Sequence, residues 1–321
     1  MPLNHGYTYT TRVGADGAGM SLEAYLTAAF PHGSLESWRA RAEEGELTDA
    51  SGRALAPGTR LRAGDVFFWH RPPWDEPDAP TDFGVIAADE TFAAVDKPSG
   101  LPTLPGAGFL EQTLLFQVRR QFPGAVPMHR LGRGTSGLTL FARTEAARRS
   151  IQADWQSRRV CKHYLAVAQG ITPEHQIIRT PIGPVPHPVL GSVHAACAGG
   201  RPSESELLRL AIAGEDTEVP RSVVLVRIAT GRPHQIRIHL ASIGHPLAGD
   251  PLFLPGGRPD PNSDSVPGDC GYLLHAWRLG FRHPLTGRAV ELQAPLPAAW
   301  KGYAALIRPR LGAIGWPSGH L

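Results

Sequence analysis

The chain of 321 residues carries a formal net charge of +3, and 42% of its residues are hydrophobic and 19% charged. These fractions are typical of a soluble globular protein, and the length is enough for one large domain and one small one. No run of about eighteen apolar residues is present, and the first residues lack the basic-then-apolar order of a signal peptide. Cys161, Cys197 and Cys270 form no Cys-x-x-Cys pair. We therefore expect no membrane span and a reduced, cytoplasmic location.

The charge is unevenly distributed along the chain. Residues 1–75 hold seven Arg against nine Asp or Glu, a local charge of −2, whereas residues 119–163 hold ten Arg or Lys against two acidic residues, a local charge of +8. A phosphate backbone is the usual partner of such a basic segment. The alternative is a solvated arginine-rich face, because the chain uses 29 Arg and only 3 Lys throughout.

The sequence predicts a small N-terminal domain over residues 1–69, with two short helices and then strands between Leu22 and Phe67. Residues 70–82 contain four prolines and are typical of a linker. Residues 33–47 and 62–66 faintly resemble the alpha-L RNA-binding motif of a small-subunit ribosomal protein. The helix there carries four glutamates that would repel phosphate, so RNA binding by this domain stays open.

The remaining residues, 83–321, form the main domain of the prediction. Strand-like runs at 85–98 and 138–142 flank a helix-like segment at 114–122, and further strands are expected at 163–169, 205–212 and 222–229. A helix is expected from about Glu145 to Arg158 with Thr144 as its N-cap, and another from about Pro233 to Ile243. Ala147, Ile151 and Trp155 should face the core. Strands and helices without strict alternation indicate an α+β fold.

Five separated segments carry a specific resemblance. They are Asp96–Pro102 (DKPSGLP), His129–Leu138 (HRLGRGTSGL), Lys162–Val167 (KHYLAV), Thr230–His239 (TGRPHQIRIH, continued by 244–251), and the pair 274–276 (LHA) and 283–287 (HPLTG). In this order and spacing they resemble the motifs of the RluA-type family of pseudouridine synthases over roughly residues 85–300.

The resemblance implies a mixed, largely antiparallel sheet and a reaction that isomerises uridine to pseudouridine. The enzyme would act on structured RNA, rRNA or tRNA, after flipping the target base at a cost of about a few kcal/mol. It implies no metal and no organic cofactor, and we expect a monomer.

The resemblance also assigns site residues. Tyr164 would stack on the flipped uracil, Arg130 would occupy the vacated space or hold the backbone, and Arg232 would pair with the catalytic aspartate. Gly132 stands at the position of that aspartate. The RNA-binding set that we predict is His129, Arg130, Arg133, Thr135, Lys162, His234 and Arg237.

Gly132 leaves two functions open, because glycine can serve as neither nucleophile nor base. Either the protein is an active synthase that uses another carboxylate, or it is a catalytically silent relative that still binds RNA. In the family's geometry Arg232 would lose its anionic partner, so we expect Asp250, Asp96 or an RNA phosphate nearby. A different interpretation makes residues 132–134 a flexible nest whose backbone amides bind phosphate.

Other motifs are weaker. Ser136 lacks the second glycine of a Gly-x-Ser-x-Gly nucleophile elbow. His187, His194 and Cys197 fit no standard zinc spacing. His234 and His239 could act in catalysis, but a role in bracing the helix is the better expectation.

Overall fold

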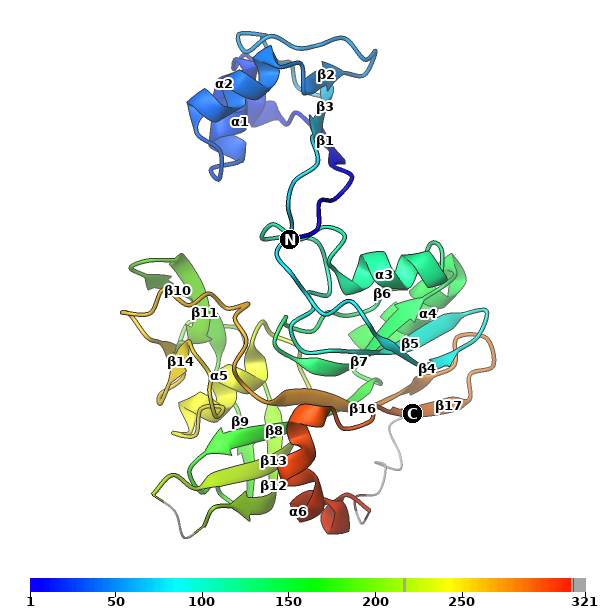
Figure 1. Ribbon diagram of the computed structural model, residues 1–321, viewed down its shortest axis with the longest axis vertical. Coiled ribbons are helices and arrows are strands. Elements are labelled where there is room, and N and C mark those ends of the chain that lie inside the picture. Colours follow the sequence, from blue (N-terminus) through cyan, green and yellow to red (C-terminus); the bar gives the residue numbers. More distant parts are fainter. Residues whose placement is uncertain (216–217, 313, 315–321) are drawn as a thin grey trace. The chain divides into compact units, whose positions relative to one another are not determined.

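The computed structural model describes residues 1–215, 218–312 and 314, and the chain divides into two compact units, Met1–Asp78 and Ala79–Leu321 (Figure 1). The division falls inside the segment 70–82 that we expected to be a linker. Strand β3 takes up the first two residues of that segment. No helix in the part of the chain that the structure describes is long and apolar enough to cross a membrane.

The N-terminal unit is a three-stranded sheet, in the order β1-β3-β2, packed with two helices. Ser21 and Ser34 cap these helices, because each side chain accepts a hydrogen bond from a backbone N–H of the first turn. The two short helices and the strands after them are confirmed; β1 was not expected. The elements are β1 (Tyr7–Arg12), a 3₁₀ turn (Ala15–Gly17), α1 (Leu22–Ala29), α2 (Leu35–Glu43), β2 (Leu47–Asp49) and β3 (Val66–Arg71).

The larger unit is built on one ten-stranded sheet. In chain order, the first half of this unit contains β4 (Gly84–Ala88), β5 (Phe92–Lys97), α3 (Leu114–Gln121), β6 (Val126–Pro127), β7 (Ser136–Ala142), α4 (Glu145–Gln156), β8 (Cys161–Gln169), β9 (His175–Ile178), β10 (Ile182–His187) and β11 (Gly191–Ala196). Its second half contains β12 (Ser205–Ala213), β13 (Arg221–Ile228), α5 (Gln235–Ser242), β14 (Phe253–Leu254), β15 (Arg258–Pro259), β16 (Leu274–Arg282), β17 (Ala289–Gln293), a 3₁₀ turn (Ala298–Trp300) and α6 (Lys301–Leu311).

The strand order is β4-β5-β7-β16-β8-β13-β12-β9, with β17 beside β16 and β6 beside β7. Within the described chain, β7 and β16 are the parallel pair of this sheet, and its other pairs are antiparallel. Alternate residues of β8 enter two different cores: Tyr164 and Ala166 join one cluster, and Leu165 and Val167 pack with Trp300 below the other face. The α+β class and the mixed, largely antiparallel sheet are thus confirmed.

The two expected helices of this unit form with shifted ends. Thr144 caps α4 by accepting a hydrogen bond from the backbone N–H of Ala147, as expected, and Ala147 and Ile151 are buried. The helix ends at Gln156, two residues before the predicted end. Helix α5 begins at Gln235 because Pro233 lies in the turn that precedes it.

Gly137 brings the first residues of β7 and β16 together. Its φ is +106°, and a Cβ there would lie 2.3 Å from the carbonyl oxygen of Ala276, so a larger residue has no room. Ser136 and Gly137 pair in parallel register with His275 and Ala276. The loops that lead into these two strands therefore lie side by side.

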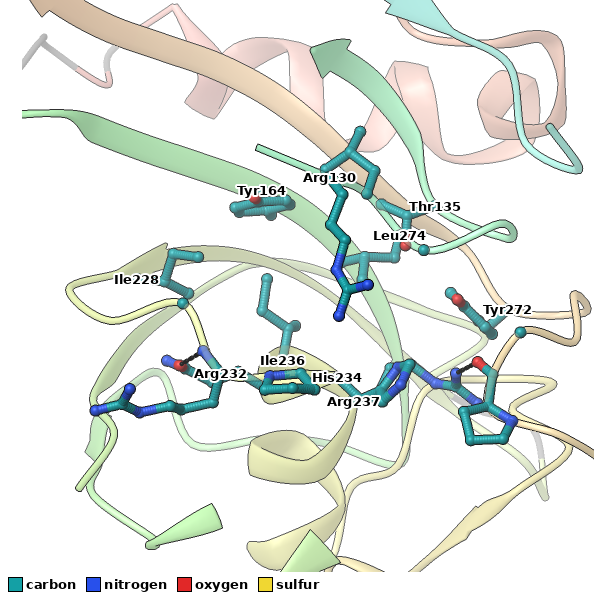
Figure 2. Close-up of a pocket in the computed structure, with 17 residues that line it drawn as sticks. Arg130, Thr135, Tyr164, Ile228, Arg232, His234, Ile236, Arg237, Tyr272 and Leu274 are labelled. Atoms are coloured by element: carbon teal, nitrogen blue, oxygen red, sulfur yellow. Dashed lines mark hydrogen bonds between the residues drawn. The ribbon is translucent and has the colours of Figure 1, made fainter. Parts of the chain in front are cut away.

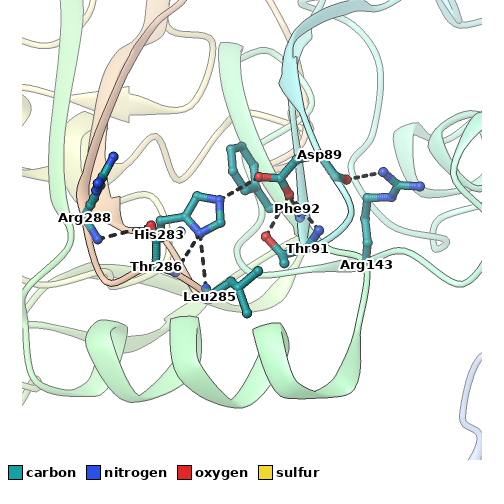
Figure 3. Close-up of polar contacts among 8 residues, drawn as sticks. All are labelled: Asp89, Thr91, Phe92, Arg143, His283, Leu285, Thr286 and Arg288. Carbon is teal, nitrogen blue, oxygen red and sulfur yellow. Dashed lines mark hydrogen bonds and ion pairs between the residues drawn. The ribbon is translucent and has the colours of Figure 1, made fainter.

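A polar contact joins two hairpin turns far apart in sequence (Figure 3). The ring of His283, after β16, donates from Nε2 to Asp89 Oδ2 over 2.7 Å, because its Nδ1 accepts from two backbone N–H groups. The other carboxylate oxygen of Asp89 accepts from Thr91 and from the backbone of Phe92. This Asp89–His283 contact ties the β4–β5 turn to the β16–β17 turn.

Candidate active site

A cavity of about 380 Å³ opens where β7 and β16 begin (Figure 2). Four segments form its walls: the loop residues 130–135 before β7, Tyr164 of β8, residues 228–237 around the start of α5, and residues 267–274 leading into β16. The volume is within the range of small-molecule sites.

The loop 128–135 is held in place by the segment 97–103. The hydroxyl of Thr103 donates to the carbonyl of Leu131 (2.9 Å) and accepts from its N–H (3.1 Å). Ser99 Oγ donates to the carbonyl of Gly134, and Gly100 N to that of Arg133. Two loops that are 30 residues apart in sequence thus behave as one support.

Lys97 is the buried centre of this support. Its ammonium donates to the carbonyl oxygens of Pro98 (2.8 Å), Leu101 (2.7 Å) and Arg133 (3.2 Å), and the residue is 0% exposed. Burial lowers the pKa of Lys97 to about 7. The three carbonyl oxygens are the acceptors that its charged form needs in this position.

Tyr164 and two aliphatic side chains form the apolar part of the cavity. Tyr164 is 8% exposed, and burial raises its pKa to about 12. Ile228 and Leu274 also line this region. An aromatic face beside aliphatic walls is suited to a flat base.

Arg237 is the buried charge of the site. It forms two parallel hydrogen bonds with Asp250, Nε to Oδ2 and Nη2 to Oδ1, both 2.7 Å, and its third nitrogen donates to the carbonyl of Pro267. The side chains are 2% and 0% exposed. The backbone N–H groups of Leu252 and Phe253 also donate to Asp250. Each nitrogen of Arg237 and each carboxylate oxygen of Asp250 therefore has a hydrogen-bond partner within the protein.

The turn before α5 has a strained residue. His234 adopts a left-handed conformation (φ 55°) and lines the cavity, and Gln235 holds the turn by accepting from Thr230 Oγ1 and from the N–H of Arg232. Burial, followed by the charge of Arg237, lowers the pKa of His234 to about 4. Its imidazole is therefore neutral near pH 7.

Positive groups surround the cavity. Among the described residues, its lining contains Arg130, Arg232 and Arg237 beside the neutral His234, and no aspartate or glutamate. Asp250 lies behind Arg237, and Asp96, whose pKa burial raises to about 6, is not part of the lining. The site can attract a phosphate or an anionic transition state, but no carboxylate of the described chain faces its interior.

Comparisons with known proteins agree with this geometry. The profile of a family described as RNA pseudouridylate synthase matches residues 91–242. An uncharacterized RNA pseudouridine synthase of Synechocystis sp. is 41% identical over 276 residues, which cover 85% of this chain and 93% of the relative. The ribosomal large subunit pseudouridine synthase D of Nitrosomonas europaea is 35% identical, covering 66% of this chain and 62% of that one. The solved structure of human RNA pseudouridylate synthase domain containing 1 has a TM-score of 0.52 at 26% identity, covering 72% of this chain and 97% of that one.

The chain belongs to the RNA pseudouridine synthase family. It is therefore an isomerase by family, with RNA as its class of substrate, and the cavity in Figure 2 is the candidate active site of a pseudouridine synthase.

Most of the predicted site residues of this pseudouridine synthase come together. Gly132 and six others line the cavity, namely Arg130, Thr135, Tyr164, Arg232, His234 and Arg237. His129, Arg133 and Lys162 do not. His129 accepts a hydrogen bond from the N–H of Leu140 and stacks on Trp155, and burial lowers its pKa to about 3. Arg133 pairs with Asp269, and Lys162 lies over the Trp155 ring.

The surroundings of Arg232 differ from those expected. We expected a buried guanidinium that had lost its partner at Gly132, but Arg232 is half-buried and donates twice to the carbonyl of Pro202. Arg237 is the buried arginine instead, and Asp250 is its partner. Three of the five N–H donors of Arg237 are thus engaged with Asp250 and Pro267, and its assignment as an RNA-binding residue stays a prediction.

His239 and His187 have structural surroundings. His239 is fully buried and bonds with Ser205 Oγ (2.9 Å) and the carbonyl of Thr180 (3.0 Å), as the bracing role predicts. Both ring nitrogens of His187 take part in hydrogen bonds to backbone groups. Neither ring is free to ligate a metal.

Sequence reasoning missed Tyr272. This residue is 4% exposed, lines the cavity, and has its hydroxyl 3.4 Å from the place of a Cβ on Gly132. It lies two residues before the motif segment 274–276 (LHA), in a loop rich in Gly and Pro, where no periodic pattern marks a site residue. The parallel pairing of β7 with β16 brings it there.

Proposed function

We propose that this protein isomerises a uridine of structured RNA, rRNA or tRNA, after the base is flipped into the cavity beside Tyr164. The observation that supports this most is the convergence of Arg130, Tyr164 and Arg237, from three separate motifs, on one cavity of base size. Stacking of a base on an aromatic side chain contributes about 1–3 kcal/mol, which offsets the unstacking of the flipped nucleotide.

Arg130 is suited to the mouth of this site. Its side chain projects into the open part of the cavity in Figure 2, and the residue is exposed. A long, positively charged side chain at that position can fill the space that the flipped base leaves in the RNA helix, or it can bind the adjacent phosphate. Ribosomal RNA is the first substrate to test, since the Nitrosomonas relative is named for the large ribosomal subunit. We further propose that the protein acts in the cytoplasm as a monomer.

The test is a comparison of pseudouridine maps of total RNA from source cells with and without the gene. We expect one or a few defined sites to disappear in the deletion strain, and purified protein to restore them in RNA from that strain. An unchanged map together with altered ribosome profiles would instead support the catalytically silent, RNA-binding alternative.

Gly132 allows a second test of the same site. A Cβ there would be 3.4 Å from Tyr272 Oη and 3.6 Å from Thr135 Oγ1, which are ordinary contact distances, so a side chain can start at this position without displacing the loop. Because loss of a nucleophile can lower a rate by up to about a million-fold, we expect Gly132→Asp to raise pseudouridine formation by about 100-fold or more. Gly132→Asn is the matched control, with the same shape and no base, and should bring no gain. An equal gain in both variants would show that packing, not the carboxylate, limits the rate.

A further inference from the structure

We propose that Tyr272 supplies the oxygen nucleophile that takes the place of the missing carboxylate at Gly132. This inference rests on the proposed isomerisation of uridine and names the group that carries it out. Tyrosine is known as a nucleophile at the anomeric carbon in some glycosidases, so the chemistry has a precedent on a related bond.

The first argument is position. A Cβ on Gly132 would lie 3.4 Å from Tyr272 Oη, and a Cβ on Gly134 would lie 3.0 Å from Cζ and 3.1 Å from Oη. The phenol therefore lies against two glycines of the loop, and its oxygen borders the space into which a side chain at 132 would extend. A side chain at Gly134 would press on the ring, so this glycine is needed for the phenol to approach.

The second argument is electrostatic. The guanidinium of Arg237 lies 4.4 Å from the centre of the Tyr272 ring, and the hydroxyl of Thr135 forms a hydrogen bond with Tyr272. Burial raises the pKa of Tyr272, whereas Arg237 and Thr135 oppose that effect; Asp250, behind Arg237, and Cys270, on the same loop, act in the direction of burial. A cation and a hydrogen-bond donor beside the oxygen are what a phenolate requires at a buried position.

Other oxygens of the site are less suitable. Asp250 is occupied by Arg237 and by two backbone N–H groups. Asp269 pairs with Arg133 and does not line the cavity. The phenol of Tyr164 is affected by burial alone, which raises its pKa to about 12, without the cation that faces Tyr272.

The step can be written in balance. Tyr272 gives its phenol proton through the Thr135 hydroxyl to water, and the phenolate oxygen forms a bond to C1′ of the uridine. The C1′–N1 bond breaks, and its electron pair leaves on uracil as the N1 anion. The base turns, C5 attacks C1′, and the O–C1′ bond breaks to return the phenolate. The proton lost from C5 and the proton gained at N1 complete an isomerisation without an oxidant or a cofactor.

The central variant is Tyr272→Phe, tested on total RNA from the deletion strain by measuring pseudouridine at the sites that wild-type protein restores. We expect its rate to fall by on the order of 1,000-fold or more while RNA affinity changes little. Tyr303→Phe is the matched control, because it removes a tyrosine hydroxyl that bonds to Arg221 outside the cavity. It should remain as active as wild type.

A double variant separates a catalytic role from a structural one. If Tyr272 supplies only the oxygen, Gly132→Asp in the Tyr272→Phe background should restore activity, since a carboxylate then stands in the same space. Failure of this rescue in a folded, RNA-binding double variant would overturn the inference, and so would full activity of Tyr272→Phe. Absence of activity in wild-type protein would instead overturn the proposed function.

The pH dependence gives an independent readout. Because the pKa of Tyr272 is raised, the phenolate fraction, and with it the wild-type rate, should rise about tenfold per pH unit between pH 6 and 9. The Gly132→Asp variant uses a carboxylate that is already ionised and should have a flat profile over this range. A flat wild-type profile would contradict the role of Tyr272.

Discussion

Asp250 determines the charge state of the active-site wall. It is fully buried and forms a bidentate pair with Arg237, and further hydrogen bonds join Arg237 to Pro267 and Asp250 to the backbone of Leu252 and Phe253. Removing one partner of such a pair leaves an uncompensated charge away from water, which costs more than the pair itself contributes. The pair is therefore a structural requirement of the pocket.

Replacing Asp250 by Asn should accordingly lower the free energy of unfolding by about 3–5 kcal/mol, because the Arg237 charge remains buried. Urea unfolding measures this difference. Asp269→Asn is the control, since its pair with Arg133 is partly exposed, and it should cost less than about 1 kcal/mol. Similar losses of unfolding free energy in both variants would mean that the buried Asp250–Arg237 pair stabilises the fold no more than the partly exposed Asp269–Arg133 pair.

The sequence placed both arginines of the 230–239 motif near the site but assigned the buried role to the wrong one. Arg232 precedes the strained turn, whereas Arg237 is one helical turn inside α5 and faces the cavity wall. His234, which lies between these two arginines, has a left-handed backbone conformation. The residue type at position 234 does not reveal this conformation.

At the scale of elements, the segment 97–103 positions the catalytic loop. Lys97 contributes one ammonium to three carbonyl oxygens, and Thr103 contributes both a donor and an acceptor to Leu131. A loop held at several backbone atoms keeps Gly132 and Thr135 in place before a substrate arrives.

A Lys97→Met variant should lose about 3 kcal/mol of stability, because the carbonyl oxygens of Pro98 and Leu101 lose the ammonium as their donor. Hydrogen exchange of the amides of residues 130–135 should also speed up, and pseudouridine formation should fall. Lys301→Met is the control, since Lys301 is exposed at the start of α6. If loop exchange is unchanged in Lys97→Met, the support is not provided by the ammonium.

Patterns of local sequence predicted the elements with strong periodicity or caps. Thr144 and the Ala147–Ile151 spacing gave α4, and apolar runs gave β7, β8, β12 and β13. Strand β1 and the β10–β11 hairpin were missed, because β1 is mostly exposed and polar and β10 contains two prolines. The strand β1 forms because it pairs with β3, which is distant in sequence, and β10 forms because it pairs with β11. Local composition does not encode either pairing.

Across the whole sheet, the Asp89–His283 contact joins its first hairpin to one formed 194 residues later. Burial raises the pKa of Asp89, but hydrogen bonds from Thr91, Phe92 and His283 outweigh it and bring the value to about 2. The folded-state pKa lies below the ordinary value of 3.8, so this stabilisation is present above about pH 4 and is lost as the pH falls toward 2.

Wild-type protein should therefore lose more stability than Asp89→Asn between pH 5 and pH 2. Because the Asp89 side chain is 35% exposed, solvent screening reduces the expected difference to about 1 kcal/mol. Urea unfolding at several pH values checks it. Parallel stability curves for the two proteins would exclude a contribution from this carboxylate.

The charge of the whole molecule leads to a prediction about RNA. The segment 119–163 carries a local charge of +8, although Arg148, Arg149 and Arg159 already pair with acidic side chains. RNA affinity should fall with salt, and Arg130→Ala should reduce the slope of log affinity against log salt by about 0.7–0.9, the effect of one phosphate contact. Arg308→Ala, on α6, should leave the slope unchanged. A slope that does not respond to Arg130 would place the RNA elsewhere.

The space for a side chain at Gly132 also has a consequence for how easily the gene can change at this position. Its backbone has no positive φ and its neighbours would accept a Cβ, so nothing in the fold demands a glycine there. Glycine and aspartate codons can differ by a single base. Glycine and aspartate at position 132 are thus one base change apart, and a selection for pseudouridine formation from randomly mutated copies of the gene would reach the change in one step.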